Sequence, residues 1–81
     1  MKFPDEVSTD VIKRLRRLEG QVRGLQRLVE EGADCKDIVT QLSAAQGALN
    51  RIGFKLMSAA MAGRDENTDM DELERLFLKL S

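Results

Sequence analysis

Cys35 is the only cysteine among the 81 residues of the chain, and the sequence contains no histidine. A single thiol without an imidazole partner cannot form an ordinary thiol enzyme or an ordinary metal site. Asp34 is a suitable N-cap residue, so a helix is predicted to begin at Cys35. The N-terminus of a helix favours a thiolate, whereas the charges of Asp34 and Asp37 oppose it. Cys35 is therefore a candidate for binding a soft metal or for reacting with an electrophile or an oxidant.

A second group of residues that could bind a ligand is basic. Residues 13–27 contain six Lys and Arg side chains and a single acid, Glu19, so pairing along the helix is not expected to absorb their charge. Such a surface fits the phosphates of duplex DNA, and Arg can also donate two hydrogen bonds to guanine. The alternatives are a solvated helix face or a surface for an acidic protein. The residues predicted to contact DNA are Arg14, Arg17, Gln21, Arg51 and Lys55.

The elements that must position these residues are helical. Apolar residues recur in steps of three and four from Val7 to Val29 and again from Ile38 to Leu56, which is the spacing of one helix face. Gly32 is the expected stop of the first helix. Residues 63–69 are predicted to be a loop, and a short third helix follows, with Thr68 as its cap and Met70, Leu73, Phe77 and Leu80 on its apolar face.

The chain is expected to form one all-α domain over residues 1–81. A short connection predicts that the first two helices form an antiparallel hairpin. A hairpin exposes much of each apolar face, so two hairpins should pair into a four-helix bundle. The sequence shows no signal region and no apolar run near the roughly 18 residues of a membrane span, and the single cysteine suits a reducing compartment, so a cytoplasmic location is expected.

The segments "RLRRLEGQVRG" and "CKDIVTQLSAAQGALNR" at this spacing resemble the CsoR/RcnR family of bacterial repressors. The resemblance implies an antiparallel four-helix-bundle dimer that pairs into a flat tetramer. It also implies binding to operator DNA that is released when an effector reaches Cys35. Arg14 and Arg51 match positions that carry DNA binding in the family, and Arg17, Gln21 and Lys55 are weaker inferences.

The resemblance also identifies what is missing from the effector site. Metal-sensing members add two ligands from the partner subunit, at the positions that Ala60 and Arg64 occupy here. Neither side chain can ligate a metal, so no metal and no cofactor is predicted. Cys35 is then a reactive thiol, or a residue retained in a member that has lost its sensor. An atypical Cu(I) site and a helical adaptor without a DNA role remain as alternatives, and no enzyme is expected.

Overall fold

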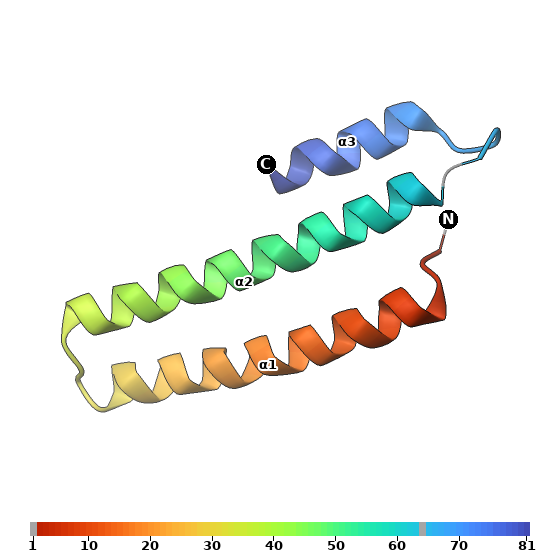
Figure 1. The fold of residues 1–81 in the computed structure, drawn as a ribbon. Coiled ribbons are helices and arrows are strands. Elements are labelled where there is room, and N and C mark those ends of the chain that lie inside the picture. The colour runs from red at the N-terminus through yellow and green to blue at the C-terminus, as the bar shows by residue number, and fades with distance from the viewer. Residues whose placement is uncertain (1, 64) are drawn as a thin grey trace.

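The structure is a computed structural model that describes residues 2–63 and 65–81. Its elements are α1 (Asp5–Glu30), α2 (Cys35–Ala62) and α3 (Met70–Leu80). α1 and α2 form a long antiparallel hairpin, and α3 folds back along the C-terminal part of α2, on the side away from α1 (Figure 1). The described chain is all-helical, which confirms the predicted fold class and hairpin. None of the three helices combines the length and hydropathy that a bilayer span requires.

The turn between α1 and α2 is set by Gly32. Its φ of 72° lies in the left-handed region, where a side chain would be strained. The Gly32 N–H donates to the Val29 carbonyl at 3.1 Å, and the Ala33 N–H donates to the Leu28 carbonyl at 3.0 Å. These two bonds satisfy carbonyls that the end of α1 would otherwise leave unpaired. The predicted stop at Gly32 is thus confirmed.

The hairpin is held by one apolar cluster between α1 and α2. Val11 and Leu18 of α1 pack with Ala45 and Ile52 of α2, and partly buried apolar neighbours extend the cluster. These four residues come from the two predicted apolar faces. Because the helices are antiparallel, the N-terminal part of α1 lies beside the C-terminal part of α2, which fixes the residues that face one another across the hairpin.

The start of α3 differs from the prediction. Its N-cap is Asp69, whose carboxylate accepts hydrogen bonds from the Asp71 and Glu72 N–H groups at 3.0 and 3.2 Å. Thr68 was the wrong residue for this role, because its hydroxyl is hydrogen-bonded within the preceding loop, where it accepts from the Asp65 N–H at 2.8 Å. An ionised carboxylate also interacts more favourably with the helix dipole than a hydroxyl does.

α3 docks on α2 through a second apolar cluster. Leu73 is 1% exposed and packs against Met57 and Ala60 of α2, with Leu76 alongside. At the other end of α3, the Leu80 side chain lies against Gly53. α3 therefore covers only the C-terminal part of α2 and leaves the half that begins at Cys35 uncovered (Figure 1).

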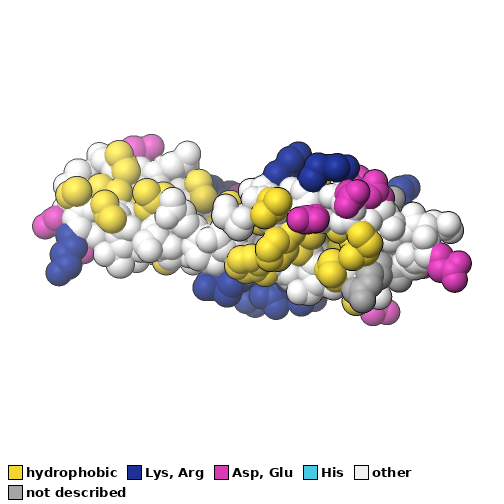
Figure 2. All heavy atoms as spheres, turned by 90° about the horizontal axis from the view of Figure 1, so that it is seen from above, with side chains coloured by type: hydrophobic (Ala, Val, Ile, Leu, Met, Phe, Trp, Pro, Cys, Tyr) yellow, Lys and Arg dark blue, Asp and Glu magenta, His cyan; other side chains and the backbone are white. Residues whose placement is uncertain are grey.

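Many apolar side chains remain exposed on this single protomer. Seen from the α3 side, they gather over α2 and α3 and again over the uncovered half of α2 (Figure 2). Leu15, Val22 and Val29 of the α1 face, and Leu42 and Leu49 of the α2 face, are between 42 and 57% exposed. The apolar faces of the hairpin are thus exposed, as expected for a single protomer. Their burial in a dimer and a tetramer stays a prediction.

Candidate nucleic-acid interface

A basic hollow lies between α1 and α2. It has a volume of about 240 Å³, and Leu18, Ala48 and Ile52 line its apolar part. Four of the five residues predicted to contact DNA line it as well: Arg14, Arg17 and Gln21 from α1 and Arg51 from α2. Helical spacing alone placed the first three on one side of α1. The hairpin brings Arg51 to them from a position 30 residues later than Gln21.

Lys55, the fifth predicted residue, does not line the hollow. Its Nζ contacts the carboxylate of Asp10 at 2.6 Å, which links α2 to α1. The same carboxylate oxygen accepts a hydrogen bond from Arg14 Nε at 2.9 Å. Since Lys55 is one helical turn beyond Arg51 and Asp10 one turn before Arg14, this ion-pair cluster stands at one end of the hollow.

The expectation that the basic residues of α1 would not form ion pairs along the helix is wrong for two arginines. Arg14 pairs with Asp10 and Arg23 pairs with Glu19, each over four residues of the helix. Asp10 lies just outside the segment in which acids are scarce, and Glu19 is the one acid inside it. No ion pair involving Arg17 or Arg51 is found among the described residues.

The surroundings of Asp10 keep it ionised. The hydrogen bond from Lys55, and after it the hydrogen bond from Arg14, lowers the pKa of Asp10 from 3.8 to about 2. The pairing stabilises the fold above the ordinary pKa, and this contribution is lost as the pH falls from 3.8 through about 2. At neutral pH the cluster of Asp10, Arg14 and Lys55 therefore carries a net charge of +1.

Asp10 was not singled out from the sequence. Two signals could have found it: its spacing of four residues from Arg14, and the antiparallel hairpin, which brings the start of α1 beside the end of α2. The second signal depends on the register of the two helices. The sequence restricts that register through the short turn but does not give it residue by residue.

Cys35 is the first residue of α2, as predicted, and the structure shows that it is exposed. The Asp34 side chain caps this helix by accepting from the Lys36 N–H at 3.0 Å. The cap and the turn at Gly32 together hold Cys35 at the tip of the hairpin. The thiol is thus accessible to small molecules in this protomer, and it lies far along α2 from the basic hollow.

The protomer does not bring the predicted effector residues together. Ala60 is near the opposite end of α2 from Cys35 and is buried against Leu73 of α3. Arg64 lies outside the described residues. Among the residues that the structure describes, no group of three or more Cys, His, Asp or Glu side chains is placed to hold a metal ion.

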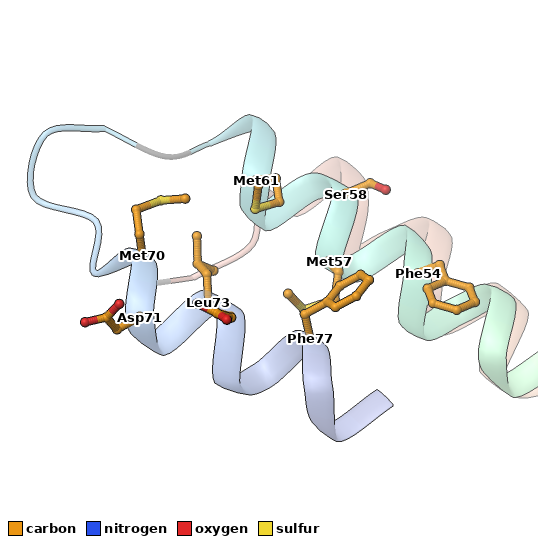
Figure 3. Close-up of a pocket in the computed structure, with 9 residues that line it drawn as sticks. Phe54, Met57, Ser58, Met61, Met70, Asp71, Leu73 and Phe77 are labelled. Carbon is orange, nitrogen blue, oxygen red and sulfur yellow. The ribbon is translucent and has the colours of Figure 1, made fainter. Parts of the chain in front are cut away.

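A larger apolar groove lies along the contact between α2 and α3. It has a volume of about 620 Å³, and its walls include Met57 and Met61 of α2 and Met70 of α3, with Phe54 and Phe77 at one end (Figure 3). Met57 is buried in the α2–α3 cluster, whereas Met61 is 37% exposed. The groove is distinct from the basic hollow, which lies on the α1 side of α2.

Comparison with known proteins identifies the relatives of this chain. The model of a family described as metal-sensitive transcriptional repressors matches residues 8–79. The copper-sensing transcriptional repressor RicR of Mycobacterium tuberculosis is 51% identical over 45 residues, which cover 56% of this chain and 47% of RicR. The copper-sensing transcriptional repressor CsoR of Bacillus subtilis is 45% identical over 47 residues, which cover 58% of this chain and 46% of that protein.

The matched part of the chain spans about half the length of the two curated relatives. No solved structure gives a significant match.

Proposed function

The chain belongs to the family of metal-sensitive transcriptional repressors, and on that premise we propose that it represses transcription by binding operator DNA through the basic hollow. Membership in a family of repressors supports the expectation of a regulator rather than an enzyme. The observation that carries the proposal is the gathering of Arg14, Arg17, Gln21 and Arg51 on one hollow formed by two helices.

The chemistry of the hollow supports this role. Three guanidinium groups offer charge and paired donors to phosphate oxygens or to guanine, and the Gln21 amide can both donate and accept. The hollow belongs to a helical hairpin rather than to a free recognition helix. Binding through such a face favours phosphate contacts and DNA shape over base-by-base reading.

Assembly into a homodimer and then a homotetramer is part of the same proposal. The apolar faces of α1 and α2 leave Leu15, Val22 and Leu49 at least 42% exposed in the protomer. Exposed apolar side chains that recur along a helix face are typical of surfaces that pair with other helices. A cytoplasmic location belongs to the proposal too, because a repressor must reach its operator.

The residues present do not fit the metal site that the family implies. Ala60 has no donor atom, an arginine stands at position 64, and histidine is absent from the sequence. Cu(I) requires at least two soft donors, and Cys35 supplies one. RicR and CsoR are copper-sensing by name, but copper sensing is no part of the function proposed for this chain. We propose instead that modification of Cys35 by an electrophile or an oxidant releases the DNA.

The proposed DNA binding is tested by salt titration against two duplexes, one from the promoter region of the protein's own gene and one of shuffled sequence. Arg14, Arg17, Arg51 and Lys55 together with Asp10 carry a net charge of +3, so each protomer in contact with DNA should contribute a slope of about −2.7 for log K against log salt, from −0.9 for each neutralised phosphate. We also expect a preference for the promoter duplex of at least roughly 1000-fold. Equal affinity for both duplexes and for other polyanions would instead support an adaptor that binds acidic partners.

The proposed sensor is tested by intact-mass measurement after exposure to formaldehyde, a persulfide, peroxide or Cu(I). We expect at least one of the first three to add mass at Cys35 and to weaken promoter binding by at least about tenfold, because the thiol is exposed. Cys35→Ser is the matched control and should keep its DNA affinity under the same treatment. If every treatment leaves the binding of the unaltered protein intact, Cys35 is no sensor. Loss of binding with Cu(I) alone would instead support an atypical copper site.

A further inference from the structure

The carboxylate of Asp10 contacts two residues that are predicted to bind DNA, Arg14 and Lys55. One oxygen, Oδ2, lies 2.9 Å from Arg14 Nε and 2.6 Å from Lys55 Nζ. Arg14 belongs to α1 and Lys55 to α2, so a single anion joins cations of both helices. A phosphate oxygen of a DNA backbone is the other anion that guanidinium and ammonium groups bind in this manner.

The charges around the hollow explain why an anion is favourable there. Arg14, Arg17 and Arg51 line a single hollow, and Lys55 lies one turn beyond Arg51. Like charges gathered around one hollow repel one another, and the carboxylate of Asp10 offsets part of that repulsion in the absence of DNA. When a duplex is bound, its phosphates supply the same compensation.

The cluster is open to exchange of its anion. The side chains of Asp10, Arg14 and Lys55 are 40, 46 and 39% exposed, so solvent and ligands reach all three. Ion pairs at such exposure contribute little net free energy, and a competing anion can displace one partner. Asp10 is also ionised at neutral pH, because the hydrogen bonds from Lys55 and Arg14 lower its pKa to about 2.

From these observations we propose that Asp10 is a built-in competitor for DNA phosphate, which occupies Arg14 and Lys55 in the free protein and lowers the affinity for any duplex. The inference rests on the proposed DNA-binding function. It assigns an acidic residue, Asp10, a role in limiting that binding. In this role the acid limits the electrostatic part of binding, which does not depend on sequence.

The chain offers a matched control for this idea. Glu19 and Arg23 form an ion pair of the same spacing on α1, at 3.2 Å and with side chains 69 and 66% exposed. Neither residue lines the hollow, and this pair does not include α2. Replacing Glu19 by Gln removes the same charge from the same helix, so it measures the effect of net charge alone.

The experiment compares unaltered protein, Asp10→Asn and Glu19→Gln in salt titrations with the promoter and shuffled duplexes. Asp10→Asn should steepen the slope of log K against log salt by about one unit for each protomer in contact with DNA, because the net charge of the cluster with Arg14 and Lys55 rises by one. Its affinity for both duplexes at roughly 50 mM salt should rise on the order of tenfold. Glu19→Gln should change the slope by less than half as much. Far-UV circular dichroism verifies that each variant is folded.

Two results would overturn the inference. If Asp10→Asn has the slope of Glu19→Gln, the effect is one of net charge and Asp10 is not a competitor. If Asp10→Asn weakens promoter binding, Asp10 positions Arg14 for DNA instead of competing with it. Failure of the proposed function is distinguishable from both, because the unaltered protein itself would then show no steep salt dependence and no preference for the promoter duplex.

Discussion

Replacing Arg51 by alanine should weaken binding to the promoter duplex by roughly 10- to 100-fold, the range for losing one well-placed bidentate contact of about 1–3 kcal/mol. Arg51 is the one cation that α2 contributes to the hollow, and it has no ion pair among the described residues. If it binds phosphate, the slope of log K against log salt should become shallower by about one unit. If it binds a base edge, the preference over shuffled DNA should fall as well.

Arg75→Ala is the matched control for this change. Arg75 is exposed on α3 and does not line the hollow, so its removal should leave promoter affinity within about twofold. Unfolding by urea should give equal midpoints for the two variants, since both side chains are exposed. Promoter binding that is the same for Arg51→Ala and Arg75→Ala would show that the hollow is not the DNA-binding surface.

Replacing Leu73 by alanine should destabilise the docking of α3 by about 2–4 kcal/mol, the usual cost of truncating a buried leucine. Leu73 is 1% exposed and is the centre of the cluster that joins α3 to Met57 and Ala60. An isolated helix of 11 residues is marginal in water, so α3 should lose its structure once this contact is weakened. Amide hydrogen exchange measures this directly, as faster exchange confined to residues 70–80.

Leu78→Ala makes the same chemical change on the other side of α3. Leu78 is 60% exposed, so its truncation should change the free energy of unfolding by no more than about 0.5 kcal/mol. The comparison removes any effect of helix propensity, which is identical for the two substitutions. Equal exchange rates in both variants would mean that α3 is not held on α2 by Leu73.

The sequence was sufficient for the helices because their boundaries depend on local chemistry. The apolar spacing of three and four, the glycine with positive φ at position 32 and the cap at Asp34 all act within a few residues. The error at α3 arose where two adjacent residues could serve as the cap. Thr68 has the required hydroxyl, but Asp65 engages it, and the choice depends on how the loop closes.

The site depends more strongly on contacts between distant residues. Arg14, Arg17 and Gln21 share a side of α1 by spacing alone, whereas the participation of Arg51 follows from the hairpin and the family resemblance. The pairing of Asp10 with Lys55 follows only from the register of α1 against α2. The predicted approach of positions 60 and 64 to Cys35 requires a second protomer, and this structure of one chain leaves it a prediction.

The length of α2 constrains how a signal can travel within one protomer. Cys35 and Arg51 are 16 residues apart on this helix, which corresponds to about 24 Å. At that distance a modified thiol cannot touch a phosphate held at Arg51, and the hydrogen-bonded backbone between them does not shorten. If modification of Cys35 releases DNA as proposed, its effect within one protomer has to reach Arg51 through α2 and the packing of α2 against α1. Because Arg14 and Arg17 come from α1 and Arg51 comes from α2, the angle between the two helices sets the separation of these cations.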